Sequence, residues 1–197
     1  MRQILDDLNI DYKEASGEAA FYGPKLDIQI KNVHGKEDTL ITIQIDFQLA
    51  ERFGMTYVDA EGQTKYPYVI HRTSIGCYER TLALLLEKYA GALPTWLMPE
   101  QVRVLPISDR LIDDAKKVEE QLSRAGIRVS CDTRSEKVGY KIREAQLEKI
   151  PYMLVIGDKE VEEGTVSVRS RKEGDLGSMP VEGFLSKILQ EIATKAK

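Results

Sequence analysis

A segment that contains two prolines, LPTWLMP at residues 93–99, divides the chain into two parts with different predicted patterns of secondary structure. Before it, alternating strand-like stretches end in one helix; after it, strands and helices alternate. A chain of 197 residues can form two modest domains, each with its own core. We therefore predict one domain over residues 1–99 and another over residues 100–197.

The first part has three apolar–polar alternating stretches, at 26–33, 39–47 and 66–72, which predict strands. Gly35 predicts a hairpin turn between the first two, and residues 59–62 predict a second turn. A helical period follows over 77–89, ended by Gly91 and Pro94. In the second strand the predicted polar face, free to bind a ligand, is Leu40, Thr42, Gln44 and Asp46.

The second part predicts an α/β domain with a mostly parallel sheet. Strands are expected at 101–107, 127–131, 152–156 and 165–169. Helices are expected at 109–125, with Ser108 as the N-cap, at 140–149, and from Pro180 onward. The expected inward residues of the first and last helices are Leu111, Ala115, Val118, Leu122, Val181, Phe184, Leu185, Ile188 and Ile192.

Composition excludes several classes of protein. Apolar residues make up 42% of the chain, and no apolar run is long enough to span a membrane. The start lacks the layout of a secretory signal, and two cysteines cannot form a disulfide framework or a four-cysteine metal site. We expect a cytoplasmic protein with no membrane partner.

The net charge of −4 argues weakly against general nucleic-acid binding. All of the acidic excess lies in the first 99 residues, however, and the second part is neutral with a local basic cluster. A locally basic surface can still hold RNA phosphates. The basic residues are Arg134, Lys137, Lys141, Arg143 and Lys149.

The stretch HRTSIGCYERTLALLLEKY at 71–89 is the most informative. Gly76 lets the backbone pass close to a ligand, and Arg80 in the first helical turn can stack on a ring or bind phosphate. Taken alone, the same pattern also fits an ordinary helix start with a surface ion pair.

This stretch resembles motif 3 of class II aminoacyl-tRNA synthetases. GEAAFYGPKLDIQ at 17–29, TIQIDFQLAERF at 42–53 and GCYERTLALLLEKYAGALPTWLMPEQ at 76–101 extend the match and resemble the threonyl-tRNA synthetase family. RSEKVGYKIREAQLEKIPYMLVIGDKEVEEGTVSVRSR at 134–171 is similar to that family's anticodon-binding domain. The resemblance implies a partial α+β, antiparallel-sheet class II catalytic core, followed by an α/β anticodon-binding domain with a mostly parallel, mixed sheet.

The resemblance assigns catalytic roles to Arg80, Lys25 and Gln44, and substrate or ATP contacts to Tyr22, Gly76 and Cys77. The alternatives are that Lys25 is a solvated strand-edge lysine and Gln44 a cross-strand amide. Cys77 replaces a common serine, and Thr39 replaces a second adenylate-contacting glutamine that it is too short to mimic.

His71 matches the third zinc ligand of the family, in which one cysteine and two histidines hold a zinc ion that chelates threonine. His34, the other histidine, lies in the predicted hairpin turn, and neither cysteine aligns with the zinc cysteine. A three-ligand site needs partners, so we expect zinc to be absent or weakly held here.

In the second domain, the resemblance points to residues close to the anticodon bases. Arginine can stack on splayed bases, and glutamate can accept a hydrogen bond from an exocyclic amine. The alternative is that these are solvated surface charges. The residues are Ser135, which replaces a common asparagine, Glu136, Lys137, Arg143, Glu160 and Arg169.

The implied parent enzyme activates threonine with ATP, uses Mg²⁺ and Zn²⁺, transfers the threonyl group to tRNA(Thr) and forms a homodimer. Residues 1–16 resemble neither motif 1 nor motif 2, so we expect the C-terminal portion of a catalytic domain that is inactive alone and exposes an apolar sheet face. The alternatives are a free-standing RNA-binding regulatory paralogue and a nucleotide-binding module without an RNA partner.

Overall fold

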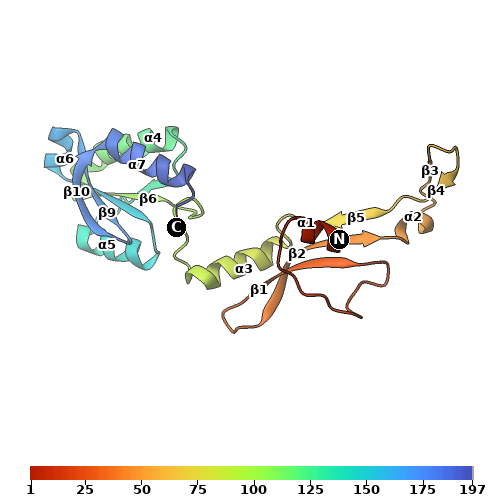
Figure 1. Ribbon diagram of the computed structural model, residues 1–197. Helices are drawn as coiled ribbons and strands as arrows, with labels where there is room; N and C mark the ends of the chain where they lie inside the picture. Colours follow the sequence, from red (N-terminus) through yellow and green to blue (C-terminus); the bar gives the residue numbers. More distant parts are fainter. Residues whose placement is uncertain (197) are drawn as a thin grey trace. The chain divides into compact units, whose positions relative to one another are not determined.

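The structure, a computed structural model, describes residues 1–196 (Figure 1). It divides into two compact units, Met1–Lys88 and Tyr89–Lys197. The boundary after residue 99 that the sequence suggested therefore stays a prediction. Within residues 1–196, no helix is long and apolar enough to cross a bilayer.

The first unit is built on an antiparallel sheet of three strands in the order β1-β2-β5, with a separate two-stranded hairpin of β3 and β4. The predicted strands, hairpin and last helix are confirmed, with β5 shorter than expected; α1 and α2 were not predicted. The elements are α1 (Arg2–Asp7), β1 (Lys25–Lys31), β2 (Glu37–Asp46), α2 (Leu49–Arg52), β3 (Tyr57–Val58), β4 (Thr64–Lys65), β5 (Val69–Arg72) and α3 (Tyr78–Tyr89).

A β-bulge interrupts the pairing of β1 with β2. Ile28 pairs with Ile41, but Gln29 pairs with Thr39, so Leu40 has no partner across the ladder. The bulge places Thr39 on the face of Gln29, whose Nε2 donates to Thr39 Oγ1 over 3.0 Å. The bulge interrupts the strict alternation of β2 at Leu40, while the predicted polar residues Thr42 and Gln44 are paired with Asp27 and Lys25.

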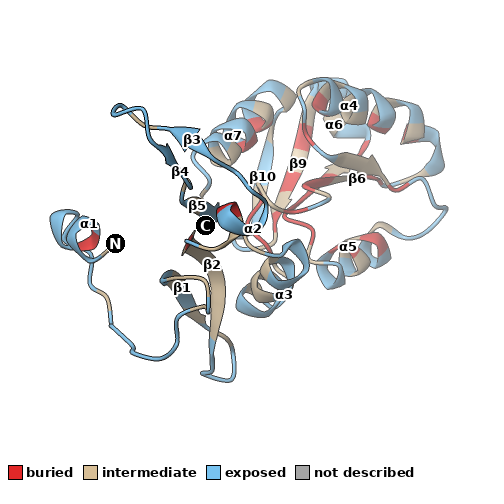
Figure 2. Ribbon diagram, turned by 90° about the vertical axis from the view of Figure 1, so that its right-hand side faces the viewer, coloured by how far each residue is buried: buried red, intermediate tan, exposed pale blue. Residues whose placement is uncertain are grey.

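The first unit buries little of its apolar surface. Among residues 1–88, only Leu5, Ala50 and Asp46 are buried, and α3 buries no residue (Figure 2). Ile70 on the edge strand β5 is 66% exposed. The expected exposure of apolar side chains is thus observed.

The second unit has one five-stranded mixed sheet in the order β10-β9-β8-β6-β7. β6 pairs in parallel with β7 and β8, while β9 pairs antiparallel with β8 and β10. The predicted mixed, mostly parallel sheet is confirmed, although α6 and β10 were not predicted. The elements are β6 (Val102–Pro106), the 3₁₀ turn η1 (Asp109–Leu111), α4 (Ile112–Arg124), β7 (Val129–Cys131), α5 (Val138–Leu147), β8 (Tyr152–Ile156), α6 (Asp158–Glu163), β9 (Thr165–Ser170), β10 (Gly174–Pro180) and α7 (Val181–Ala193).

The core of the second unit lies between the sheet and its helices. α4 and α7 cover one face of the sheet, and α5 lies on the other (Figures 1 and 2). Val104 and Leu154 on the central strands and Phe184 on α7 are fully buried. The predicted apolar stripes of α4 and α7 face this core.

Ser108 does not cap the helix that follows it. Its side chain makes no capping hydrogen bond, and its buried Oγ has no hydrogen-bond partner among residues 1–196. The chain first makes a 3₁₀ turn at Asp109–Leu111, and α4 begins only at Ile112. The N-cap prediction is wrong because this turn separates Ser108 from the first turn of α4.

Candidate functional site

Four predicted site residues of the first unit lie together on the polar face of the sheet. Lys25 on β1 and His71 on β5 are the two register partners of Gln44 on the central strand β2. The Tyr22 hydroxyl donates to Gln44 Oε1, and the Tyr22 and His71 rings are 6.0 Å apart. The neighbouring polar groups form a surface on which a small polar ligand can lie.

The Tyr22-Gly23-Pro24 turn is fixed against β2 by close backbone contact. The N–H of Ile45 donates to the carbonyl of Pro24, and the N–H of Phe47 donates to the carbonyl of Tyr22, each over 3.0 Å. A Cβ at Gly23 would lie 2.0 Å from the Ile45 carbonyl oxygen. Only glycine fits there, and this close approach positions Tyr22 beside Gln44.

Lys25 is paired with Asp27 two residues further along β1. Its Nζ lies 2.7 Å from Asp27 Oδ2, and hydrogen bonding to this carboxylate raises the pKa of Lys25. Burial alone would raise the pKa of Asp27, but hydrogen bonds from Lys25 and Thr42 hold it below its ordinary value. An anionic ligand that reaches the Lys25 ammonium therefore competes with Asp27.

His71 is oriented by Asp46 on the neighbouring strand, with 3.1 Å between Nε2 and Oδ2. Asp46 Oδ1 accepts hydrogen bonds from the N–H groups of Gln48 and Leu49, each over 2.8 Å. Burial would raise the pKa of Asp46, but the bonds from Leu49, His71 and Gln48 outweigh it and keep the pKa low. A carboxylate partner of this kind commonly orients a metal-ligating histidine.

The described residues do not complete a metal site around His71. Among residues 1–196, no group of three or more histidine, cysteine, aspartate or glutamate side chains is arranged to hold an ion. His71 could offer its other ring nitrogen, but further ligands would have to come from elsewhere.

Gly76 and Arg80 approach β2 at its bulged end. The chain after β5 continues along β2, with the N–H of Thr73 donating to the Thr42 carbonyl over 3.1 Å. Gly76 has φ +80°, and a Cβ there would lie 2.1 Å from the Leu40 carbonyl oxygen. Arg80 then donates from Nη1 to the Thr39 carbonyl over 3.0 Å.

The site residues of the first unit thus fall into two groups along β2. A small cavity of about 100 Å³ beside Arg80 is lined also by Thr39, Leu40 and residues of α3, but by neither Lys25 nor Gln44. Arg80, on α3, thus contacts the same strand that carries Gln44, but Gln44 does not line the cavity beside Arg80. Cys77, at the start of α3, donates from its exposed thiol to Glu79 over 2.8 Å, which lowers the pKa of Glu79.

In the second unit, the predicted anticodon residues are carried mainly by segments that follow the parallel strands. Ser135, Glu136 and Lys137 lie between β7 and α5, and the Ser135 hydroxyl donates to Asp109 over 2.9 Å. Lys137 is the exposed N-cap residue of α5, and Arg143 is exposed on that helix. Ligands of open α/β sheets bind outside the carboxyl ends of such strands.

Glu160 and Arg169 have structural partners of their own. Glu160 Oε2 accepts a hydrogen bond from the N–H of Gly157 over 3.0 Å at the start of α6. Arg169 on β9 lies 3.8 Å from the Asp175 carboxylate, and its side chain is 37% exposed. Both carboxylate and guanidinium keep free polar atoms for a ligand.

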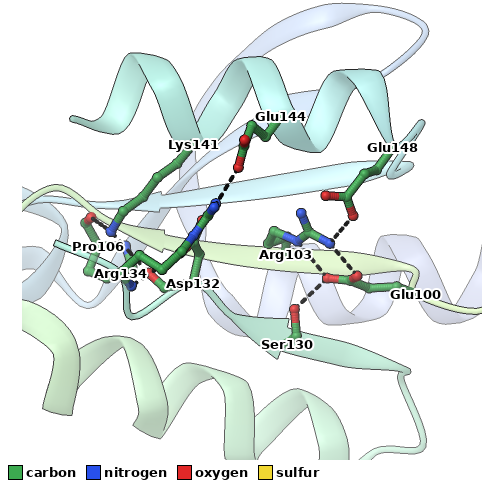
Figure 3. A network of polar contacts seen from close by, with 9 residues as sticks. All are labelled: Glu100, Arg103, Pro106, Ser130, Asp132, Arg134, Lys141, Glu144 and Glu148. Carbon is green, nitrogen blue, oxygen red and sulfur yellow. Dashed lines mark hydrogen bonds and ion pairs between the residues drawn. The ribbon is translucent and has the colours of Figure 1, made fainter. Parts of the chain in front are cut away.

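The basic cluster predicted from the sequence is smaller than expected. Lys141 is 2% exposed, and its ammonium donates to the carbonyls of Pro106 and Asp132 over 3.2 and 3.0 Å (Figure 3). Arg134 is bound by the carboxylates of Asp132 and Glu144, each at 2.6 Å. Lys149 is half-buried and donates to a backbone carbonyl. Of the five residues in this cluster, all within residues 1–196, Lys137 and Arg143 are the exposed ones that make no such hydrogen bond or ion pair.

Comparison with known proteins gives the family. Residues 1–89 match the tRNA synthetase class II core domain (G, H, P, S and T), and residues 101–191 match the anticodon binding domain. A threonine–tRNA ligase of Clostridium perfringens is 66% identical over 99% of this chain, and one of Clostridium botulinum is 62% identical over all of it. The chain belongs to the threonyl-tRNA synthetase family.

A solved member of the threonyl-tRNA synthetase family has the same fold. The crystal structure of the RNA binding domain of threonyl-tRNA synthetase from Cryptosporidium parvum Iowa II matches with a TM-score of 0.86 and 38% identity. The match covers 96% of this chain and 48% of that one. The chain spans about 30% of the length of the clostridial relatives.

Two sets of side-chain contacts in the chain were not predicted. Asp27 pairs with Lys25, and Asp46, which was predicted to lie on the binding face of β2, pairs with His71. A second polar cluster joins Arg103 to Glu100 and Glu148, each at 2.6 Å (Figure 3). Hydrogen bonds to these carboxylates raise the pKa of Arg103, and the bond to Glu100 has the larger effect. No sequence motif marks this cluster.

Proposed function

We propose that this chain takes part in attaching threonine to tRNA(Thr) and that its second unit reads the anticodon. The names of the clostridial relatives and the two matched domains support this proposal. The observation that carries it for the first unit is the grouping of Lys25, Gln44, Tyr22 and His71 on one polar sheet face.

The proposed reaction has two steps. A carboxylate oxygen of threonine attacks the α-phosphorus of ATP, which gives threonyl-adenylate and releases pyrophosphate. A hydroxyl of the terminal ribose of the tRNA then attacks the threonyl carbonyl carbon and releases AMP. Positioning and neutralisation of negative charge supply most of the catalysis in such reactions.

Each predicted site residue of the first unit has a proposed role. The Lys25 ammonium and the Arg80 guanidinium neutralise charge that develops as the adenylate forms. The Gln44 amide, held by Tyr22, orients the adenylate, while Gly76 lets the chain pass beside the nucleotide and Cys77 lies next to it. Bound Mg²⁺ would neutralise the phosphates of ATP, and bound Zn²⁺ would recognise the threonine hydroxyl, with His71 as one ligand.

In the second unit, we propose that the loop Ser135–Lys137, together with Arg143, Glu160 and Arg169, contacts the anticodon bases. The exposed cations on α5 support this proposal, because they can meet a loop of unpaired RNA. We also propose a cytoplasmic location and a homodimer for the protein that contains this chain.

Titration with RNA tests the anticodon proposal. The 197-residue chain is mixed with a stem-loop that carries a threonine anticodon and with the same stem-loop carrying a changed anticodon. We expect tighter binding to the threonine anticodon and affinity that falls with salt, because phosphates release counterions on binding. Equal affinity for both loops would contradict the proposal, and a general RNA-binding role would then be favoured.

A further inference from the structure

Tyr140 is the exposed aromatic residue of the second unit. Its side chain sits on α5 and is 47% exposed. The other four aromatic residues of this unit are buried or half-buried: Tyr89, Trp96, Tyr152 and Phe184. A single exposed ring is ordinary on a protein surface, so its surroundings decide whether it has a role.

The Tyr140 ring lies beside charged neighbours. The Arg134 guanidinium carbon lies 6.0 Å from the ring centroid. Arg134 is itself fixed by the carboxylates of Asp132 and Glu144, as Figure 3 shows. Hydrogen bonding to Glu144 also raises the pKa of the Tyr140 phenol. The cation–π contact with Arg134 favours one orientation of the exposed ring.

The next residue along α5 fixes the direction in which Tyr140 points. Lys141 is buried and bound to two carbonyls at the carboxyl ends of β6 and β7. Successive helix residues point about 100° apart, so an inward Lys141 keeps its neighbour at the surface. Lys137 and Arg143 lie three residues to either side, on the same helix face as Tyr140.

We propose that Tyr140 is a stacking platform for one unpaired base of the RNA loop that the second unit reads. An exposed ring flanked by two exposed cations is the arrangement that single-stranded RNA recognition uses, with bases on aromatic faces and phosphates on cations. This inference rests on the proposed anticodon function and adds a residue to it. The phenol oxygen is not needed for stacking, but the ring is.

Three variants of the 197-residue chain test the inference. Tyr140→Leu keeps an apolar side chain without a ring, Tyr140→Phe keeps the ring, and Leu147→Ala is the matched control, since Leu147 is 70% exposed on the same helix. We expect Tyr140→Leu to weaken binding of the threonine anticodon stem-loop by about five- to 100-fold. Tyr140→Phe and Leu147→Ala should stay within about threefold of wild type.

A spectroscopic readout separates stacking from a structural role. The loop bases are replaced one at a time by 2-aminopurine, whose fluorescence falls when it stacks on an aromatic ring. One position should be quenched by wild type and by Tyr140→Phe but not by Tyr140→Leu. Trp96, the sole tryptophan, should report the same unfolding midpoint for all variants.

The possible failures are distinguishable. A wild-type chain that does not discriminate between anticodons would overturn the proposed function, and this inference with it. If wild type discriminates while Tyr140→Leu binds as tightly as wild type, this inference alone is wrong.

Discussion

The buried ammonium of Lys141 donates a hydrogen bond to the backbone carbonyl of Asp132 over 3.0 Å. A second bond runs to the carbonyl of Pro106, at the end of the neighbouring strand. The lysine thereby ties together the two segments that leave β6 and β7, and the second of these carries Ser135, Glu136 and Lys137. The conformation of the segment Ser135–Lys137, which we propose to contact the anticodon, therefore depends on the two hydrogen bonds of Lys141.

Replacing this lysine by an apolar side chain of similar length should destabilise the second unit. Lys141→Met leaves two carbonyls without their donor in a buried place, at a cost of about 2–4 kcal/mol. Urea unfolding followed by Trp96 fluorescence measures the change. Lys137→Met, at the exposed N-cap position of the same helix, should shift stability by less than about 0.5 kcal/mol. Equal changes in the free energy of unfolding for the two variants would mean that the buried hydrogen bonds of Lys141 do not stabilise the second unit.

Asp132 gives a pH-dependent contribution to stability. Hydrogen bonding to Arg134 holds the pKa of the buried Asp132 carboxyl below its ordinary value. The stabilisation is therefore complete above the unfolded pKa, about 4, and is lost as the pH falls through the lower folded pKa. We expect Asp132→Asn to cost about 1.5–3 kcal/mol at pH 7.

The difference between wild type and Asp132→Asn should stay constant down to about pH 5 and shrink below about pH 4. Urea midpoints across this range measure it. Glu136→Gln on the same segment, where the side chain is exposed, serves as the control. A difference that is unchanged at the lowest pH would show that Asp132 acts through packing rather than charge.

The two cysteines should differ in reactivity. Cys77 is exposed, whereas burial raises the pKa of the half-buried Cys131 thiol to about 11. At pH 8 only about one Cys131 in a thousand is a thiolate, the reactive form. A disulfide reagent should label one thiol rapidly and the second only on unfolding, and Cys77→Ser should remove the rapid phase. Rapid labelling of both would refute the burial of Cys131.

Gly76 should tolerate substitution less well than a glycine of similar backbone conformation. Gly76 and Gly62 have φ of +80° and +77°, but only at Gly76 would a Cβ meet a backbone oxygen. Gly62→Ala should cost about 1 kcal/mol from strain, and Gly76→Ala about 1–3 kcal/mol more. Hydrogen exchange of peptides covering β2 and the turn between β3 and β4 measures both. Similar exchange in the two variants would place Gly76 away from the Leu40 carbonyl.

A polypeptide of these 197 residues should self-associate through its first unit. Ile70 is 66% exposed on the edge strand β5, and exposed apolar edges promote association. Ile70→Lys should reduce association, while Leu147→Lys, at an equally exposed site of the second unit, should not. Sedimentation velocity over a wide concentration range decides the matter. A monomer at every concentration would run against the expectation.

Periodicity predicted most elements, because amphipathic stripes such as that of α4 extend over several turns. It missed α6, which has six residues, and β10, whose GDLGSMP sequence lacks apolar alternation. It also missed the bulge at Leu40, because an extra residue in one strand is defined only by the partner strand.

For the candidate sites, the resemblance located segments, and the structure decided which side chains remain available. Lys141 looked like a surface cation but is buried, because only the tertiary fold brings two carbonyls to its ammonium. Arg134 is likewise bound to two carboxylates, one of them on α5. Charge counts along a sequence cannot separate such residues from free cations.

The unpaired Leu40 has a consequence for how the hairpin can vary. The bulge separates the tip-proximal end of β2, Glu37–Thr39, from its remainder, Ile41–Asp46. An insertion or deletion of one residue on the tip side can be absorbed at this point, since the ladder beyond it keeps its own register. The tip is therefore the place where loops could be grafted or could diverge while Gln44 keeps its orientation.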